Sequence, residues 1–389
     1  ILSVSSSPSD GFRKGIVINT ESAAAAIRTA LSAAREQSGT AIREALVSIS
    51  GNHIQTTAGN ASIIVSGKTI SQDDIDKVID AAGDSPVNAG REIIHVLPTD
   101  FVIDSGRRLK DPLGIPGSRL EAKVNIVSAS TEPLQRLVAS CEKAGLQVAD
   151  LVLQSIASAE SALSAEDREM GTVLVDIGGG TTDIVLFKDG WLQHAAVLGI
   201  GGNHFTNDLS VGLRVPFAEA ERLKKQYGLA FHSGDYEEID VISNVGHGEA
   251  VKKVSRKLIT DILRLRAEEL LELIKEEMDR TAGHDAVTGA VFTGGGVLVP
   301  SFERLAENII SMPVRIGYPC LSPKNLTQQD ASVPPITGVQ EQFNSPEYAA
   351  GIGMVLYGAG VAPGRHEASD GGLFTKMTGL FRNIIGRRK

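Results

Sequence analysis

Three consecutive glycines, flanked by acidic and hydroxyl residues, separate two apolar segments near the middle of the chain. Residues 173–177 and 184–187 are rich in β-branched side chains and predict two buried strands. Glycine permits positive φ and close approach of a ligand to the backbone, and consecutive amides that turn the same way can bind an anion. The hydroxyls add further donors. We therefore expect a nucleotide phosphate site made by Gly178, Gly179, Gly180, Thr181 and Thr182.

Asp176 ends the first of these strands beside the glycines. Its carboxylate would repel a bare phosphate, but Mg²⁺ bridges carboxylate and phosphate, directly or through its retained waters. Asp176 is therefore the expected Mg²⁺ ligand. It is also the one candidate general base, so at most slow turnover of a bound nucleotide is expected. The alternative for the glycine stretch alone is an ordinary tight hairpin.

A second run of glycines, Gly294, Gly295 and Gly296, follows a predicted strand at 290–293 and precedes a predicted helix at 301–310. Glycines at such a junction let an adenine or ribose lie flat on the backbone, near a helix N-terminus that favours anions. Glu221 and Lys224 lie three residues apart on a predicted helix at 216–227, so both can face one side. By spacing alone, a solvated surface pair is the simpler interpretation.

The last residues form a pattern of their own. An apolar stripe with helical spacing is flanked by cationic side chains, and no acidic residue occurs from residue 373 onward. Such a helix lies in the plane of an anionic membrane; a helix that docks on the body or binds a partner is the alternative. The predicted anchor comprises Leu373, Phe374, Met377, Leu380, Phe381, Ile384, Ile385, Arg387, Arg388 and Lys389.

Composition excludes several other classes. The 389 residues carry a formal net charge of −9, which argues against a nucleic-acid-binding protein. Two distant cysteines and histidines without metal-ligand spacing exclude a disulfide framework and a zinc site, and fit a reducing compartment. No apolar run is long enough to span a membrane, and no secretory signal opens the chain. The Walker and dinucleotide fingerprints are also missing.

The elements that must position these residues alternate between helix and strand. We predict a helix at 23–35 capped by Thr20, a strand at 45–50, a helix at 69–82 and a strand pair at 93–98 and 101–104. A strand at 121–128 and a helix at 132–144 follow. A third strand at 192–198 extends the glycine hairpin into a meander, and a helix starts at Gly201–Asn203. Later come a long helix at 250–280, a surface loop at 318–345 and a final helix at 346–357. The predicted buried face of the long helix is Leu258, Ile262, Leu265, Leu270, Leu273 and Ile274.

These features resemble the FtsA family of bacterial actin-like cell-division proteins. The resemblance runs through nearly the whole chain, and the terminal amphipathic helix is part of it. Hsp70, sugar kinases and rod-shape actins lack an inserted block, here expected at 68–148, together with such a tail. The motifs that carry it are His95–Pro98 with Asp111–Gly114, Asp176–Asp183, Gly294–Gly296 and Ser345–Gly351.

The resemblance implies an α/β, actin-like ATPase fold with an inserted α+β subdomain. The expected division is 1–67 and 149–172 for subdomain 1A, 68–148 for the insert 1C, 173–210 and 286–360 for 2A, 211–285 for 2B, 361–372 for a linker and 373–389 for the membrane helix. It also implies that Glu221 and Lys224 contact the ribose and adenine of ATP.

The resemblance further implies partners and a place in the cell. The family tethers the tubulin-like protein FtsZ, through its C-terminal peptide, to the cytoplasmic face of the inner membrane at the division septum. It also polymerises and contacts other division proteins through the insert. The family opens with an Asp-Ile-Gly-Thr phosphate hairpin, and since this chain begins at Ile1 we expect that hairpin upstream.

Two other functions remain open from the sequence. One is an actin-like ATPase or chaperone, which would need a substrate-binding domain in place of the tail. The other is a pilus-assembly scaffold of similar build, which would be expected to lack the basic amphipathic tail.

Overall fold

The computed structural model describes residues 1–84, 88–104, 106–229, 237–244, 249–282, 287–320 and 341–359. A five-stranded sheet lies at its centre, in the order β11-β10-β9-β14-β15. The first three strands form the antiparallel meander that the sequence predicted, and β14 and β15 run parallel to β9. The strands are β9 (Thr172–Ile177), β10 (Thr182–Lys188), β11 (Trp191–Leu198), β14 (Gly289–Thr293) and β15 (Val314–Ile316).

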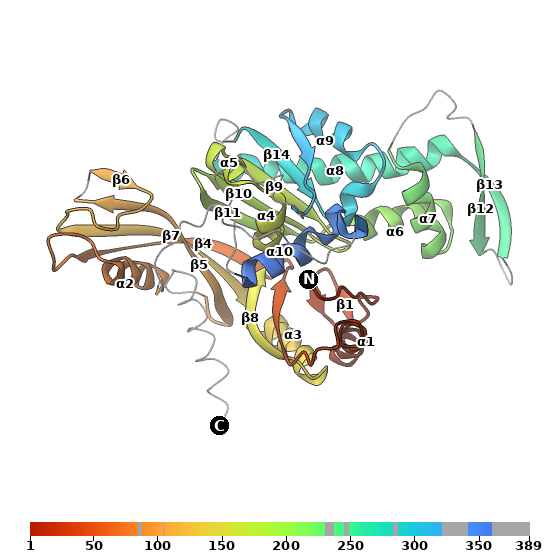
Figure 1. The fold of residues 1–389 in the computed structure, drawn as a ribbon. Coiled ribbons are helices and arrows are strands. Elements are labelled where there is room, and N and C mark those ends of the chain that lie inside the picture. The colour runs from red at the N-terminus through yellow and green to blue at the C-terminus, as the bar shows by residue number, and fades with distance from the viewer. Residues whose placement is uncertain are drawn as a thin grey trace.

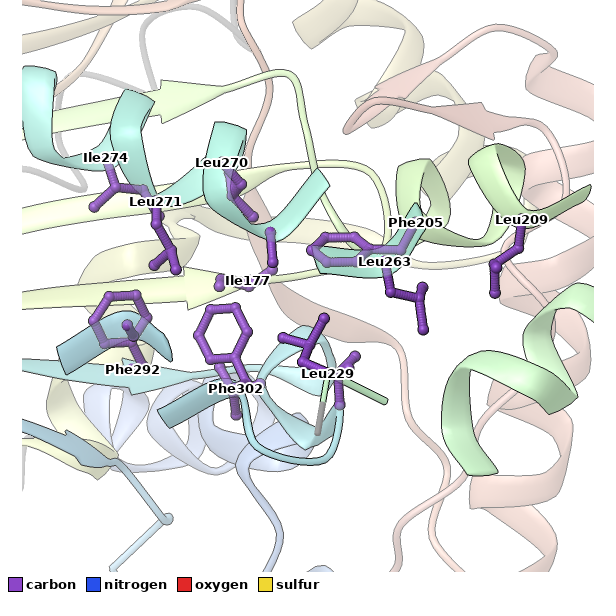
Figure 2. Packing of buried hydrophobic residues seen from close by; sticks show 14 of the residues in the cluster. Ile177, Phe205, Leu209, Leu229, Leu263, Leu270, Leu271, Ile274, Phe292 and Phe302 are labelled. Carbon is purple, nitrogen blue, oxygen red and sulfur yellow. The ribbon is translucent and has the colours of Figure 1, made fainter. Parts of the chain in front are cut away.

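Both faces of this sheet are buried, which explains why every residue of β9 is buried and four of its six side chains are apolar. Alternate side chains of a strand point to opposite faces, so Val173, Val175 and Ile177 join one core cluster and Leu174 joins another. In the first cluster, the rings of Phe292 and Phe302 pack edge to face at 5.7 Å (Figure 2). Its helices are α6 (Gly202–Leu213), α7 (Phe217–Tyr227), α8 (Arg256–Ala282) and α9 (Phe302–Ile310).

The second cluster lies on the other face of the sheet, where α4 and α10 pack against each other (Figure 1). Gly353 of α10 is indispensable here, because an added Cβ would lie 1.7 Å from the Ala157 carbonyl oxygen. The elements on this side are α4 (Gln154–Ala162), the short α5 (Ala165–Met170), the 3₁₀ turns η5 (Glu341–Phe343) and η6 (Pro346–Tyr348), and α10 (Ala349–Gly358).

A separate antiparallel sheet, in the order β4-β7-β5-β6, extends to the left of the body in Figure 1. The helix α2 packs on one face of it and closes a third core cluster. A capping box at Ser71 begins α2, inside the predicted helix at 69–82. The elements are β4 (Ile54–Ile64), α2 (Gln72–Gly83), β5 (Arg91–Ile103), β6 (Arg107–Leu109) and β7 (Arg119–Ser130).

The N-terminal part of the body holds a parallel strand pair, β3 with β8. The helices α1 and α3 pack against each other beside it. A short hairpin, whose two strands have two residues each, precedes α1. These elements are β1 (Phe12–Arg13), β2 (Ile16–Val17), α1 (Thr20–Ser38), β3 (Glu44–Ile49), α3 (Thr131–Lys143) and β8 (Gln147–Leu153).

Three sequence predictions about elements were wrong. Asn19, not Thr20, caps α1 by accepting from the Ser22 amide. Residues 93–104 are not two strands, because the single strand β5 runs through them. Pro98 lies within β5, where the register of its pairing with β7 shifts. The long helix begins at Arg256 rather than 250. Residues ahead of it form the hairpin β12 (Glu238–Asn244) and β13 (Glu249–Ser255).

The predicted buried face of that long helix was also partly wrong. Leu258 and Leu265 are exposed, and Leu270 and Ile274 are buried as expected. The true face is one residue out of phase in the first half of α8 and is formed by Ile259, Leu263, Ala267, Leu270, Leu271, Ile274 and Met278.

If the insert began at residue 68, as expected, the strand β4 would be left outside the four-stranded sheet to which it belongs. β4 ends at Ile64 and pairs along its whole length with β7, so the sheet places the start between β3 and β4, near Gly51. At the other end, α3 and β8 pack with α1 and β3, so they belong with the body, although 68–148 would include α3 and the first two residues of β8.

Candidate nucleotide site

The glycine hairpin joins β9 to β10 as the sequence predicted. Asp176 and Asp183 are register partners on these antiparallel strands, and both carboxyl groups are buried. Asp176 accepts hydrogen bonds from the Ser158 hydroxyl at 2.5 Å and from the Gln154 amide at 3.2 Å, both on α4. Asp183 accepts from the Ser50 hydroxyl at 2.7 Å.

Burial makes both carboxyl groups hard to ionise. It raises the pKa of Asp176, against which the hydrogen bonds from Ser158 and Gln154 act. It also raises the pKa of Asp183 to about 8, assisted by the neighbouring charge of Asp176. Two buried carboxyl groups that lie side by side beneath an anion site would be stabilised in their charged forms by a bound cation.

The donor set fits Mg²⁺. Asp183 Oδ1 is buried and has no hydrogen-bond partner among the described residues. Within those same residues no group of three or more acidic, His or Cys side chains could enclose a metal. One or two carboxylates that leave room for waters and phosphates are typical of Mg²⁺ sites. Asp176, the predicted ligand, and Asp183 are the residues that would hold the ion.

The second glycine loop lies against the first site. Thr293 at the end of β14 pairs with Asp176, and Gly294 follows with φ of +87°. A Cβ added to Gly294 would lie 2.3 Å from Asp176 Oδ1, and one added to Gly296 would lie 2.3 Å from Ile177 Cγ2. The structure therefore brings together two loops that are more than a hundred residues apart in the chain.

The start of α6 closes the space between these loops. The amides of Gly202 and Asn203 donate to the carbonyl oxygens of Gly178 and Gly179, at 2.8 and 2.7 Å. A side chain at Gly201 would collide with the Gly178 oxygen, at 2.6 Å. The sequence placed the start of a helix here, but it gave no signal that its first amides bind the hairpin.

Glu221 and Lys224 also lie at this junction. The buried Lys224 ammonium is 2.7 Å from Glu221 Oε2, and it donates to the Gly202 carbonyl and to the Thr206 hydroxyl at 3.1 and 2.9 Å. Burial lowers the pKa of Lys224, and the bond to Glu221 opposes that shift. An added Cβ on Gly202 would lie 3.7 Å from Lys224 Nζ and 3.9 Å from Gly296 Cα. The pair is not a solvated surface pair.

The two threonines of the hairpin support it from within. Thr182 is fully buried and its hydroxyl donates to the Ile200 carbonyl at 2.8 Å. The Thr181 hydroxyl lies 3.0 Å from the Ser50 hydroxyl. Thr182 was expected to donate to phosphate, but its contact with Ile200 directs its hydroxyl to the protein; Thr181 accepts from Ser50, and its donation to phosphate stays a prediction.

Sequence reasoning missed four residues of the site: Ser50, Gln154, Ser158 and Thr206. Ser50 and Gln154 each come next to the end of a strand, β3 and β8, and that position is the signal that could have found them. The predicted membrane helix at 373–389 lies outside the described residues, as does most of the predicted loop at 318–345. No helix in the described part of the chain is long and apolar enough to cross a membrane.

Comparison with known proteins agrees with this architecture. The family model described as "Cell division protein FtsA" matches residues 173–353, and the one described as "SHS2 domain inserted in FTSA" matches residues 51–128. The second range contains β4, α2, β5, β6 and all but the last two residues of β7, and therefore coincides with the four-stranded sheet and α2.

Full-length relatives match over most of their length. Cell division protein FtsA of Pseudomonas aeruginosa is 35% identical over 361 residues, which cover 92% of this chain and 83% of that protein. The protein of the same name from Bacillus subtilis is 31% identical over 360 residues, 92% of this chain and 77% of that one. The one from Escherichia coli K12 is 30% identical over 368 residues, 92% and 84% respectively.

Among solved structures, the PilM-PilN type IV pilus biogenesis complex is similar, with a TM-score of 0.59 and 17% identity over 92% of this chain and 90% of that one. An identity this low shows a shared fold and nothing of a shared function. The central sheet, the two glycine loops and the inserted sheet together make an actin-like ATPase fold, and the chain belongs to the FtsA family of cell division proteins.

Proposed function

We propose that this chain binds ATP with Mg²⁺ between its two glycine loops and tethers FtsZ filaments to the cytoplasmic face of the inner membrane at the division septum. Membership of the FtsA family supports the role in division. The observation that carries the nucleotide site is the approach of Gly294 to Asp176, because it joins two separately predicted halves into one site.

In this proposal each half of the site receives one part of the nucleotide. The adenosine lies against Gly294–Gly296 and is contacted by Glu221 and Lys224. The phosphates lie on the amides of Gly179 and Gly180, since the Gly178 amide already donates to the Thr181 carbonyl at 2.9 Å, and Mg²⁺ is held by Asp176 and Asp183. The metal would neutralise the phosphates and the paired carboxylates, whose burial disfavours their charged forms.

We expect any ATP turnover to be slow, so the chain serves mainly as a scaffold. Asp176 remains the one candidate general base, and one of its oxygens already accepts from Ser158 and Gln154. These two donors oppose the rise in pKa that burial causes, and the other oxygen is the proposed Mg²⁺ ligand, so neither oxygen is left free to accept a proton from water.

The FtsZ peptide would dock on the subdomain formed by α6, α7, α8 and the β12–β13 hairpin. Leu258 and Leu265 lie seven residues apart on the exposed side of α8. Val211 on α6 lies beside that helix, since an added Cβ on its neighbour Gly212 would lie 2.9 Å from Ile262. Val211 is 70% and Leu265 69% exposed, and these apolar side chains would pack against a bound peptide.

The remaining contacts follow from the family and the sequence. The basic amphipathic helix at 373–389 would lie on anionic lipid, as predicted above. Self-association into filaments would present many such tails at once and strengthen membrane binding. The inserted sheet would contact other division proteins, and the net charge of −9 gives no support for nucleic-acid binding.

The test is recruitment of purified FtsZ to anionic vesicles in the presence of this chain and Mg·ATP. FtsZ should pellet with vesicles only when the chain is present. Leu265→Glu should release FtsZ but leave the chain on the vesicles, whereas Phe381→Glu should release both. An exposed residue remote from this subdomain, Met170, supplies the matched control Met170→Glu, which should change neither. FtsZ that remains in solution with the unaltered chain would overturn the tethering role.

A further inference from the structure

A short hairpin at the N-terminus covers one side of the glycine hairpin. Its strands β1 and β2 are joined by the turn Lys14–Gly15, which comes close to Gly180. A Cβ added to Gly180 would lie 3.2 Å from both the Cα and the amide nitrogen of Lys14. No residue of this N-terminal hairpin was among the predicted site residues.

The turn is held in place by its own backbone. Gly15 has φ of +76°, and a Cβ there would lie 2.8 Å from the Ser50 carbonyl oxygen, so the turn rests on the loop that follows β3. At the base of the hairpin, the amides of Ile18 and Asn19 both donate to the Gly11 carbonyl, at 2.8 and 3.1 Å. Lys14 is therefore presented by a fixed element.

The side chain of Lys14 extends along the same site. Its Cδ lies 3.8 Å from the position of a Cβ on Gly199, at the end of β11. The pKa of His204 is lowered by burial and also by the positive charge of Lys14. Lys14 is exposed, and among the described residues its ammonium has no hydrogen-bond or ion-pair partner. Beside an anion site, it is a cation without a committed partner in the described structure.

The order of contacts along the glycine hairpin gives this cation a place. Gly178 contacts the start of α6, next to Lys224 and Gly296, where the adenosine is proposed to lie. Gly179 faces Asn203, and Gly180 faces Lys14. A nucleotide that starts at the adenosine end and follows the hairpin would therefore reach Lys14 with its last phosphate.

We infer that the Lys14–Gly15 turn forms a third wall of the site and that Lys14 binds the terminal phosphate of ATP. The inference rests on the proposed nucleotide site and adds to it a preference for ATP over ADP. An ammonium that reaches only the third phosphate contributes to the affinity for the triphosphate and little to that for the diphosphate.

Titration of the full chain with fluorescent ATP and ADP analogues, each with Mg²⁺, tests this. A charge-assisted hydrogen bond corresponds to roughly tenfold or more in affinity, so Lys14→Ala should weaken ATP binding about tenfold and ADP binding less than about twofold. Lys14→Arg should retain most of the preference for ATP. Arg13→Ala, on the same hairpin and equally exposed, is the matched control and should change neither affinity.

The outcomes separate the two claims. If the unaltered chain binds neither nucleotide, the proposed site is wrong and this inference is wrong with it. If it binds both but Lys14→Ala keeps the original ratio of ATP to ADP affinity, the site stands and the role of Lys14 is overturned. A ratio that falls for Lys14→Ala and not for Arg13→Ala supports it.

Discussion

Asp176 and Asp183 lie opposite each other on β9 and β10, and each buried carboxyl group is held by a serine from a different part of the chain. Ser158 of α4 donates to Asp176, and Ser50 at the end of β3 donates to Asp183. Residues directly opposite on antiparallel strands project from the same face of the sheet. The pair therefore gathers α4, β3 and the glycine hairpin around one point.

This pair predicts a pH-dependent stability. Folded Asp183 keeps its proton up to a pKa of about 8, whereas the ordinary value is 3.8. The folded state thus binds more protons than the unfolded state over this range, and the free energy of unfolding falls as pH rises from about 4 to about 8, by at most about 1.4 kcal/mol per unit. Urea titrations across this range should show the decline, and Asp183→Asn should flatten it.

The control for that measurement is Glu36→Gln, which alters an exposed carboxylate on α1. It should leave the slope as it is in the unaltered chain. Saturating Mg²⁺ should reduce the decline, because a bound cation favours the ionised pair. An Asp183→Asn variant with the original slope would show that this carboxyl group does not cause the effect.

The packing of the second glycine loop predicts that alanine substitutions at the adjacent Gly294 and Gly295 differ sharply in their effect on stability. Gly294→Ala places a Cβ 2.3 Å from Asp176 Oδ1 at φ of +87°, whereas Gly295→Ala meets nothing nearer than 3.7 Å. We expect Gly294→Ala to lower the free energy of unfolding by about 1–3 kcal/mol or more and Gly295→Ala to change it little. The melting temperatures of the two variants, measured by thermal unfolding, test this difference. Equal melting temperatures for the two variants would contradict the close packing of the loops.

Lys224 and Lys225 form a matched pair for nucleotide binding. Lys224 is buried against Gly202 and Thr206, and Lys225 is 74% exposed on the same helix. Lys224→Met should weaken binding of a fluorescent ATP analogue by about tenfold, the scale of one charged hydrogen bond. Lys225→Met should leave it within about twofold. Comparable losses in both would mean that Lys224 acts only through general charge.

The tail predicts two separable contributions to membrane binding. Phe381→Glu removes part of the apolar stripe, where a fully buried side chain contributes about 1.5–3 kcal/mol, and should abolish pelleting with vesicles at any salt concentration. Neutralising Arg387, Arg388 and Lys389 removes about 1 kcal/mol each near an anionic surface. That loss should matter at low salt and vanish at high salt. Unchanged pelleting of Phe381→Glu would favour a helix that docks on the body.

Local patterns predicted the parts of the site that depend on local chemistry. The glycines at 178–180 and 294–296 were identified because backbone freedom and anion binding depend on residue type at adjacent positions. Glu221 and Lys224 were placed correctly on one helix, but the spacing could not tell whether they were buried. Ser50 and Ser158 were missed because tertiary contacts alone bring them to Asp183 and Asp176.

The errors in the fold have a similar origin. Residues 249–255 contain lysines and alanine, which helices accept, so β13 was interpreted as the start of α8. That early start helped to put Leu258 and Leu265 on the buried face, although both are exposed. The extent of the insert was misjudged because the pairing of β4 with β7 links segments about sixty residues apart, which no local pattern records.

The most direct measurement is the affinity of the full chain for a fluorescent ATP analogue with and without Mg²⁺, compared with Asp176→Asn and Gly179→Val. The account predicts saturable binding that Mg²⁺ strengthens. Asp176→Asn should remove the Mg²⁺ effect, and Gly179→Val should weaken binding with or without the metal, because its side chain blocks approach to the amides. Affinity that is unchanged in both variants would contradict a nucleotide site between the two glycine loops.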